Sequence, residues 1–249
     1  MEEMPEVLSG GNASGAVIRV GSTVRKPWEP NAGVVHQFLT HLRASGIDVP
    51  APMGRDEQGR QVIEFVPGGN ALARMPLELT TLHAVGAQVR RIHDASESFD
   101  ISDLDTADTL LPADNAELMC HNDLAPWNLI VGDRMLFIDW DGAGPSTRLW
   151  DLAYAAQSFA MLAAGEPVDQ AAARLRAFAD GYDADMTLRS ALPDAMGQRT
   201  NAMYEMLERS NRHQVEPWGT MFVEGHGEHW LGATQYVQQH RSAWIEALK

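Results

Sequence analysis

The sequence predicts an α+β protein with two lobes, a small strand-rich lobe at residues 1–66 and a larger, mainly helical lobe at residues 67–249. Short apolar runs separated by turn residues fill the first part, which is typical of strands. Apolar residues at three- and four-residue spacing dominate the second part, as in amphipathic helices. Pro67-Gly68-Gly69 breaks the chain between the two parts. Because ligands often bind between two lobes, we expect a ligand-binding cleft there.

The elements of the first part follow from local patterns. Apolar residues recur at helical spacing over residues 34–44, and Gly46 ends this helix in the manner of a C-terminal cap. A glycine-rich stretch at residues 10–15 precedes the first expected strand. Strands are expected at residues 16–20, 23–26, 53–55 and 61–66.

In the second part, apolar periodicity predicts a helix at residues 77–96 and further helices from Trp150 onward. Between them, residues 117–142 have the pattern of a strand-loop-strand insert. Two apolar strands flank a Gly132-Asp133 turn in this insert, which predicts a hairpin.

The predicted hairpin brings three polar side chains together. Asn128 and Asp139 stand at its two ends, and Asp123 lies on the loop that precedes it. Phosphoryl transfer needs a carboxylate that orients or accepts the proton of the attacking hydroxyl, and hard oxygen ligands that hold Mg²⁺ against the phosphates. Asp123 suits the role of catalytic base, and Asn128 and Asp139 suit the role of metal ligands.

The charge of the chain narrows the classes of function. The formal net charge of the 249 residues is −15, and residues 1–66 are nearly neutral, so the acidity lies almost wholly in the second lobe. A field of this sign attracts cations and argues against nucleic-acid or membrane binding, although it also serves solubility. No stretch has the roughly 18 to 20 apolar residues of a membrane span, and the start at Met1 lacks a signal-peptide pattern. We therefore expect a cytoplasmic protein.

Two motifs resemble a known family. They are His121-x-Asp123-x-x-x-x-Asn128 and, ten residues later, Ile138-Asp139-Trp140-Asp141. Their spacing is similar to that of the catalytic loop and the metal-binding segment of aminoglycoside phosphotransferases. Those enzymes are similar in fold to protein kinases, whose signature is H-R-D-x-x-x-x-N followed by D-F-G. The resemblance therefore implies a two-lobed protein-kinase-like fold, with an antiparallel sheet and one helix in the small lobe.

The resemblance also implies the kind of substrate and two supporting residues. Asn122 stands where protein kinases have arginine, and Trp140-Asp141 replaces Phe-Gly, so the expected substrate is a small molecule rather than a protein. His121 is expected to orient the catalytic loop. Asp151, in Trp150-Asp151-Leu152-Ala153, is expected to support that loop from the following helix.

Lys26 is the expected phosphate ligand on the nucleotide side. Besides the C-terminal Lys249 it is the one lysine of the chain. Thr23-Val24-Arg25-Lys26 overlays the kinase strand V-A-I-K, and strand alternation puts Val24 and Lys26 on one face. Arg25 is the competing assignment.

Two further parts of the nucleotide site are inferred from the resemblance. The stretch at residues 10–15 is similar to the glycine-rich loop that covers the phosphates, and the hinge at Phe65 and Val66 should offer backbone groups to adenine. ATP and GTP both remain open as the phosphate donor.

The glutamate that usually pairs with the kinase lysine is missing. Val35 and His36 occupy the matching positions on the helix. Either His36 or Glu29 substitutes for the glutamate, or Lys26 is held in a different way.

Carboxylates of the second lobe are candidates for binding the acceptor, because they would hold ammonium or guanidinium groups by charge-assisted hydrogen bonds. Acids on a solvated helix face are the alternative interpretation. His226 and His229 also suggest a metal site, but no third ligand is evident. The candidate acceptor-binding residues are Asp141, Glu205, Glu208, Glu224 and Glu228.

The function predicted from these features is Mg²⁺-dependent transfer of the γ-phosphate of ATP or GTP to a hydroxyl of a small, cationic acceptor such as an aminoglycoside-like antibiotic. A metabolic kinase of the same fold, acting on choline, an amino sugar or a hydroxy amino acid, is the first alternative. The second is a nucleotide-binding regulator without activity, which the missing helix glutamate suggests.

Overall fold

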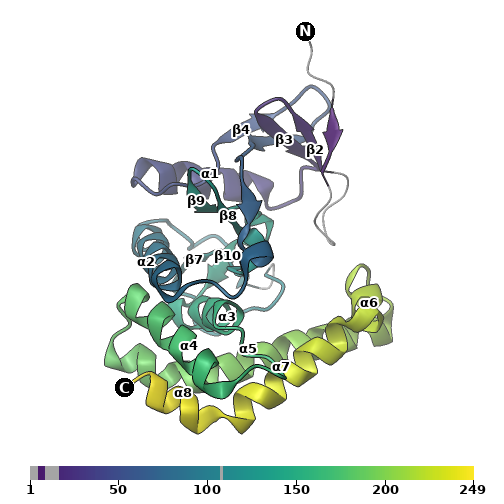
Figure 1. Ribbon diagram of the computed structural model, residues 1–249. Coiled ribbons are helices and arrows are strands. Elements are labelled where there is room, and N and C mark those ends of the chain that lie inside the picture. The colour runs from purple at the N-terminus through teal and green to yellow at the C-terminus, as the bar shows by residue number, and fades with distance from the viewer. Residues whose placement is uncertain (1–4, 9–16, 107–108) are drawn as a thin grey trace.

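The computed structural model describes residues 5–8, 17–106 and 109–249 of the chain. The glycine-rich stretch at residues 10–15 lies outside these residues. In Figure 1 a sheet with one helix lies above a larger group of helices. This arrangement confirms the predicted α+β architecture of a small antiparallel sheet and a larger helical part.

The small sheet is antiparallel, with the strand order β1-β2-β3-β5-β4. Helix α1 (Ala32–Ala44) connects β3 to β4 and begins two residues before the predicted start. Strand β5 ends two residues before the predicted end, because its pairing with β3 stops where Glu64 meets Thr23. The strands are β1 (Glu6–Val7), β2 (Ile18–Val20), β3 (Thr23–Lys26), β4 (Pro52–Arg55) and β5 (Gln61–Glu64).

The predicted hairpin is present as β8 (Leu129–Val131) and β9 (Met135–Phe137). Arg134, in the turn between these strands, forms ion pairs with Asp48 and Glu64 of the small lobe. The hairpin is thereby attached to both parts of the molecule.

Two strand pairings were not predicted. Strand β6 (Gly69–Asn70) pairs with β8, and β7 (Leu118–Cys120) pairs with β10 (Gly144–Ser146). The Gly-Pro-Ser sequence of β10 has no apolar alternation and low strand propensity. Its extended form therefore depends on its partner strand, which local sequence does not reveal.

The helical part contains long helices and several single turns. Helices α5 and α7 pack along each other. Their joined ends, with α6 and η5 between them, form an arm that projects to the right in Figure 1. The helices are α2 (Leu79–Ser96), α3 (Arg148–Phe159), α4 (Val168–Tyr182), α5 (Met186–His213), α6 (Trp218–Met221), α7 (Gly227–Gln239) and α8 (Arg241–Ala247). The single turns are η1 (Ala71–Arg74), η3 (Pro126–Asn128), η4 (Trp140–Gly142) and the π-helical η5 (Phe222–His226). Within the described residues, no helix has both the length and the apolar character needed to cross a membrane.

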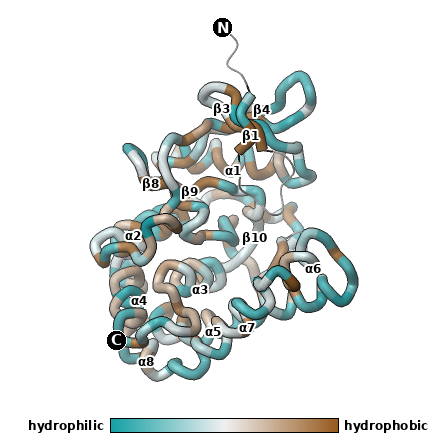
Figure 2. Tube along the Cα trace, turned by 45° about the vertical axis from the view of Figure 1, so that its right-hand side comes forward, coloured by the Kyte–Doolittle hydropathy of each residue, from teal (hydrophilic) through white to brown (hydrophobic). Residues whose placement is uncertain are grey.

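One hydrophobic core joins the hairpin to the helices. Phe38 of α1, Phe137 of β9, Phe159 of α3, Phe178 of α4 and Trp244 of α8 are all fully buried in it. Figure 2 shows hydrophobic stretches on β8 and β9 and hydrophilic turns at the outer ends of the helices. Burial of such large side chains contributes about 1.5–3 kcal/mol each, so the hairpin is held firmly against the helices.

Helices α2 and α4 approach each other closely at two glycines. A Cβ atom at Gly181 would lie 1.9 Å from the backbone oxygen of His83, and one at Gly86 would lie 2.1 Å from that of Phe178. The two backbones therefore touch without intervening side chains. This contact keeps His93 of α2 within hydrogen-bonding distance of Tyr182 of α4, at 2.8 Å.

Gly181→Ala should reduce the free energy of unfolding by about 2–3 kcal/mol, because the new methyl group would push the two helices apart. Gly232→Ala on α7 is the matched control, since its Cβ would meet nothing closer than 3.8 Å. The control should be neutral or slightly stabilising. Urea unfolding of both variants measures the difference, and an unfolding free energy of Gly181→Ala equal to that of the control would contradict the close contact.

Candidate active site

The three polar residues of the predicted hairpin lie together in the structure. Asn128, at the end of η3, donates its amide nitrogen to Asp123 Oδ2 at 2.7 Å and to the Asp123 carbonyl oxygen at 3.0 Å. Asp139 follows β9 at the other end of the hairpin, and its φ of 60° and ψ of 63° are left-handed values that few residues other than glycine adopt. The hydrogen bonds of Asn128 use its nitrogen, so its amide oxygen remains as a ligand atom.

The Asp123 carboxylate is half-buried and bonded on both oxygens. Tyr154 donates its hydroxyl to Oδ1 at 2.8 Å, and the Trp127 indole makes a long hydrogen bond of 3.4 Å to Oδ2. Burial raises the pKa of the Asp123 carboxyl above its ordinary value, while the bonds from Tyr154 and Asn128 oppose the rise. Such a carboxylate accepts a proton more readily than one in water.

Lys26 is buried at the end of β3 and pairs with two carboxylates. Its Nζ lies 3.0 Å from Asp139 Oδ1 and 2.6 Å from Asp141 Oδ2. Burial alone would lower the pKa of Lys26, but the two carboxylates outweigh it and raise the pKa above its ordinary value. The lysine therefore stays charged and links the sheet to the segment after the hairpin.

The structure answers how Lys26 is held without a helix glutamate. The competing residue Arg25 lies 3.7 Å from Asp56 instead of beside Asp139. His36 is buried, burial lowers its pKa, and its Nε2 has no hydrogen-bond partner among the described residues. Glu29 is exposed. Lys26 is therefore held by Asp139 and Asp141, and neither His36 nor Glu29 takes the place of the helix glutamate.

The hinge residues lie at the junction of the sheet and the hairpin. Val66 is buried and packs in a small cluster with Ile130, Leu136 and Ile138. Phe65 lies under the Arg19 guanidinium, which is 4.0 Å from the ring centre. The junction therefore has an apolar surface, and the backbone N–H of Phe65 donates to the Ser22 carbonyl oxygen at 2.8 Å.

Asp151 supports the loop that carries Asp123. It is buried, and its Oδ1 accepts the backbone N–H of Asn122 at 2.9 Å while its Oδ2 lies 3.1 Å from Nε2 of His93. His121 is buried too. Its Nδ1 accepts the backbone N–H of Asp123 at 3.3 Å, and its Nε2 lies 3.0 Å from the Ile138 carbonyl oxygen, so the ring joins the catalytic loop to the end of the hairpin.

Three residues of this site escaped the sequence reasoning: His93, which bonds Asp151, Tyr154, which bonds Asp123, and Arg199 of α5, which donates to the Asn122 carbonyl oxygen at 3.1 Å. His93 and Arg199 are far from the motif along the chain, and no local pattern distinguishes them from other polar residues on amphipathic helices. Tyr154 could have been found, because it lies three residues after Asp151 and therefore on the same side of α3.

The structure does not gather the predicted acceptor-binding acids into one group. Asp141 pairs with Lys26 and receives a hydrogen bond of 3.4 Å from Gln61, so it faces the sheet. The other four lie on the arm. Glu205 accepts a hydrogen bond from Asn201, Glu208 pairs with Arg212, and Glu224 and Glu228 are exposed.

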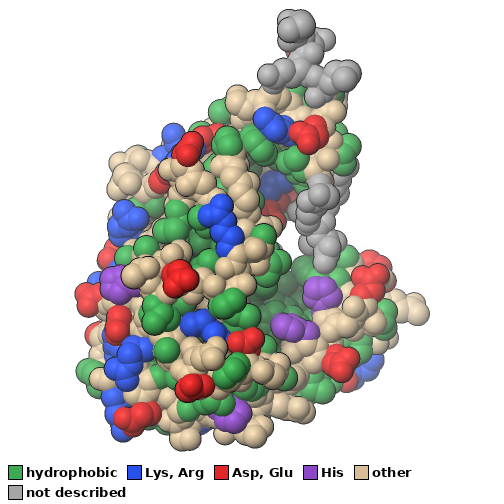
Figure 3. Space-filling model, viewed as in Figure 1, with side chains coloured by type: hydrophobic (Ala, Val, Ile, Leu, Met, Phe, Trp, Pro, Cys, Tyr) green, Lys and Arg blue, Asp and Glu red, His purple; other side chains and the backbone are tan. Residues whose placement is uncertain are grey.

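Aromatic side chains lie beside Asp123. Tyr154 stacks on Trp230 at 5.9 Å and meets the edge of Trp127 at 6.4 Å. Figure 3 shows a hollow between the sheet and the arm with hydrophobic side chains inside it. We call this group the aromatic cluster; its buried members are Ala125, Tyr154, Met206, Leu207, Trp230 and Ala233, with Leu111, Met203, Tyr204, Trp218, Met221 and Phe222 partly buried against it.

One group of possible metal ligands lies outside the predicted metal site. Within the described residues, ligand atoms of His93, Cys120 and Asp151 lie within 4.8 Å of one another. All three are buried, and hydrogen bonds to Tyr182 and Asn122 already engage His93 and Asp151. We therefore interpret the group as structural. Within the described residues, His226 and His229 do not belong to a group of three possible metal ligands.

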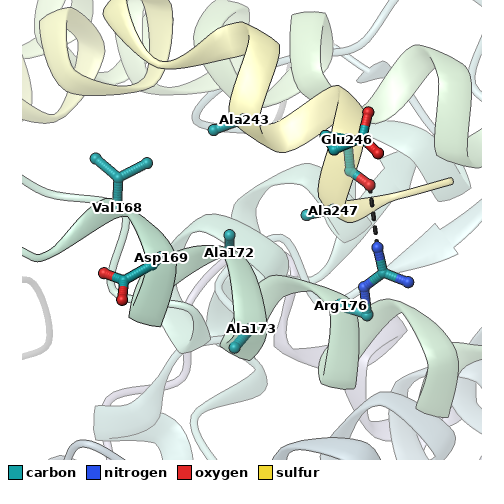
Figure 4. Close-up of a pocket in the computed structure, with 8 residues that line it drawn as sticks. All are labelled: Val168, Asp169, Ala172, Ala173, Arg176, Ala243, Glu246 and Ala247. Carbon is teal, nitrogen blue, oxygen red and sulfur yellow. Dashed lines mark hydrogen bonds between the residues drawn. The ribbon is translucent and has the colours of Figure 1, made fainter.

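A shallow groove between α4 and α8 is separate from this site. Figure 4 shows that its lining combines alanines and Val168 with the charged residues Asp169, Arg176 and Glu246. The Arg176 guanidinium donates to the Glu246 carbonyl oxygen at 3.0 Å. All of its lining residues, which include Val168 and Ala243, belong to α4 and α8. In Figure 1 the groove lies at the end of the molecule opposite the sheet.

Asp151→Ala should reduce the free energy of unfolding by about 2–5 kcal/mol, because it leaves the Asn122 N–H and the Nε2 atom of His93 without partners, each at about 1–3 kcal/mol. Asp194→Ala removes a carboxylate of an exposed ion pair with Arg241 and is the control, with an expected loss below about 1 kcal/mol. Denaturant unfolding measures both. Equal losses would show that Asp151 is not needed to hold the loop.

Comparisons with known proteins agree with the resemblance found in the sequence. Residues 93–188 match the family model described as phosphotransferase enzyme family. This range contains Asp123, Asn128, Asp139 and Asp151. No curated protein matches the sequence.

Solved structures share the fold over nearly the whole chain. Amicoumacin kinase, in complex with AMP-PNP, Ca²⁺ and Ami, is 14% identical with a TM-score of 0.69, over 94% of this chain and 88% of that chain. A choline/ethanolamine kinase family protein from Mesorhizobium loti is 16% identical with a TM-score of 0.65, over 98% and 92%. Spectinomycin phosphotransferase, in complex with ADP and spectinomycin, is 12% identical with a TM-score of 0.62, over 99% and 92%. The chain therefore has the protein-kinase-like fold of these enzymes, and its residues 93–188 carry the pattern of the phosphotransferase enzyme family.

Proposed function

We propose that the protein transfers the γ-phosphate of ATP or GTP to a hydroxyl group of a small, cationic acceptor. One observation supports this proposal above all. Lys26, which is about a hundred residues away along the chain, lies at the same place as Asp123, Asn128 and Asp139. Phosphoryl transfer requires a base, oxygen ligands and a cation for the phosphates at one site.

Asp123 is the proposed catalytic base. As the acceptor oxygen bonds to the γ-phosphorus, its proton passes to the Asp123 carboxylate. The bond between that phosphorus and the bridging oxygen breaks, and the electron pair leaves with the nucleoside diphosphate. The raised pKa of Asp123 suits this role, because the carboxylate must hold the proton it receives.

Asn128 and Asp139 are the proposed ligands of Mg²⁺. Both present hard oxygen atoms, which Mg²⁺ prefers, and the nitrogen of Asn128 is already used by Asp123. When bound, Mg²⁺ would neutralise negative charge on the phosphates. Lys26 is the proposed ligand of the α- and β-phosphates; its side chain now bonds Asp139 and Asp141, which a phosphate could replace as anionic partners.

The other predicted site residues have binding or supporting roles. We propose that the backbone at Phe65 and Val66 binds the nucleobase, that His121 and Asp151 hold the catalytic loop, and that residue 66 ends the nucleotide-binding lobe.

An aminoglycoside-like antibiotic is the leading acceptor. The excess negative charge of residues 67–249 supports it, with Glu205, Glu208, Glu224 and Glu228 as ligands of its amino groups.

The aromatic cluster favours a second class of acceptor. Choline and related metabolic amines carry a compact cation that aromatic rings bind through cation–π attraction, worth up to about 2 kcal/mol when the cation is desolvated. Rings of Trp127, Tyr154 and Trp230 lie next to the proposed base. The likeness to the choline/ethanolamine kinase family protein supports this alternative.

The proposal is tested by Mg²⁺-dependent nucleotide turnover with a panel of aminated antibiotics and small hydroxy amines. Asp123→Asn should lower the rate of transfer by about 10²- to 10⁴-fold with little change in nucleotide affinity, because it removes the base alone. Asp133→Asn, in the exposed hairpin turn, is the control and should keep full activity. Tight nucleotide binding without any phosphorylated product would support an inactive regulator instead.

A second measurement addresses the metal ligands. Calorimetric titration with nucleotide should show that Mg²⁺ strengthens binding to the wild-type protein, and that Asp139→Ala loses most of this gain because one of two proposed ligands is gone. Asp123→Asn should retain the gain. An undiminished effect of Mg²⁺ in Asp139→Ala would remove Asp139 from the metal site.

A further inference from the structure

The backbone of Asn122 has a left-handed conformation directly before the proposed base. Its φ of 64° is a value that residues other than glycine rarely adopt, although asparagine tolerates it better than most. Asp139, the proposed metal ligand, is also left-handed, with a φ of 60°. Residues in such conformations persist only where their surroundings hold them, and they gather at functional sites.

Two contacts bind the Asn122 backbone to the helices. Its N–H donates to Asp151 Oδ1 at 2.9 Å, and its carbonyl oxygen accepts a hydrogen bond from Arg199 Nη2 at 3.1 Å. Asp151 belongs to α3 and Arg199 to α5, and both side chains are buried. The backbone on the N-terminal side of Asp123 is thus attached to the helical part of the molecule.

The Asn122 side chain bonds a different segment, the one that follows Asp139. Its Nδ2 donates to the carbonyl oxygens of Gly142 and Gly144, at 3.2 and 3.3 Å. Its Oδ1 is buried and has no hydrogen-bond partner among the described residues. A buried acceptor without a partner costs stability, so the amide does not serve merely to fill space. The two hydrogen bonds that it donates are its contribution.

Asp139 lies between two contacts with the catalytic loop. Before it, the carbonyl oxygen of Ile138 lies 3.0 Å from Nε2 of His121. After it come the two carbonyl groups that Asn122 binds. Asp139 itself bonds Lys26 of the small sheet. Asn122 is therefore a direct connection between the loop that is fixed to the helices and the segment that is bonded to the sheet.

We propose that Asn122 is a positioning residue, which fixes the distance between the proposed base Asp123 and the proposed metal ligand Asp139. Phosphoryl transfer requires that the acceptor hydroxyl at the base and the γ-phosphate at the metal ligands come together, so this distance controls the rate. The two hydrogen bonds from Nδ2 hold the two segments at that distance. This inference rests on the proposed functions of Asp123 and Asp139.

Asn122→Gly is the direct test, because glycine accepts the left-handed conformation and has no side chain to donate. Amide hydrogen exchange of the ligand-free protein, followed by NMR, reports the connection. Ala143 lies between the two acceptor residues, and its N–H donates to the Trp140 carbonyl oxygen at 2.9 Å. We expect this amide to exchange about 10- to 100-fold faster in the variant, because two hydrogen bonds are lost, while the amides of α7 keep their wild-type rates.

Asn115→Gly is the matched control. Asn115 is also left-handed, with a φ of 55°, but it is exposed. The exchange rate of Ala143 should not change in this variant. Asn122→Asp is a second test, because aspartate keeps the shape of the side chain and replaces the donor nitrogen by an oxygen. It should accelerate the exchange of Ala143 as Asn122→Gly does, which excludes the added flexibility of glycine as the cause.

A kinetic measurement distinguishes positioning from general support of the fold. With an acceptor in hand, the kcat of Asn122→Gly should fall about 10- to 100-fold, because a displacement of about 1 Å is enough for such a loss. The KM for nucleotide should stay unchanged, since Asp139 keeps its bond to Lys26. Asn115→Gly should keep the wild-type kcat.

If Ala143 exchanges at the wild-type rate in both Asn122 variants, the proposed connection is wrong, whether or not the protein is a phosphotransferase. Equally faster exchange of all amides, those of α7 included, or an unchanged kcat would also overturn the positioning role. If exchange rises at Ala143 and not in α7 but no acceptor is ever phosphorylated, the connection stands and the proposed function fails.

Discussion

The buried Asp151 carboxylate is the interaction on which the site depends. It joins helix α3 to His93 of α2 and to the backbone of Asn122, and so connects three segments that are distant along the chain. A buried carboxylate is tolerated only where hydrogen bonds satisfy it, and both of its oxygens are satisfied. The loop that carries Asp123 is thereby fixed to the helical core, which is itself closely packed where α2 meets α4 at Gly86 and Gly181.

A second set of charged contacts joins the small sheet to the hairpin and the segment that follows it. Lys26 is buried between Asp139 and Asp141, and Arg134 links the hairpin turn to Asp48 and Glu64. Lys26 is the basic residue of β3 that reaches Asp139 and Asp141, whereas Arg25 of the same strand lies beside Asp56. Charge complementarity across the junction thus takes the place of the lysine–glutamate pair that the sequence lacks.

The sequence allowed most of the fold and the central chemistry to be predicted. Periodicity located the helices near 32–44 and 79–96 to within two residues, and the turn at Gly132-Asp133 located the β8–β9 hairpin, because these signals are local. Strand β10 was missed, since Gly144–Ser146 is extended only through its pairing with β7. Strand β5 ends two residues before its predicted end, because its pairing with β3 stops at Glu64, and α1 begins two residues before its predicted start.

The sequence by itself determined the identity and spacing of Asp123, Asn128 and Asp139, because their chemistry and the hairpin between them are encoded within twenty consecutive residues. Only the tertiary structure decided the surroundings of these residues. It brought Lys26 to Asp139 and Asp141, Tyr154 to Asp123, and Arg199 to Tyr154. It also put aromatic rings rather than the predicted acids beside the base. Contacts of this kind join residues that are tens of positions apart along the chain. They also depend on burial, and a side chain becomes buried only when the chain has packed.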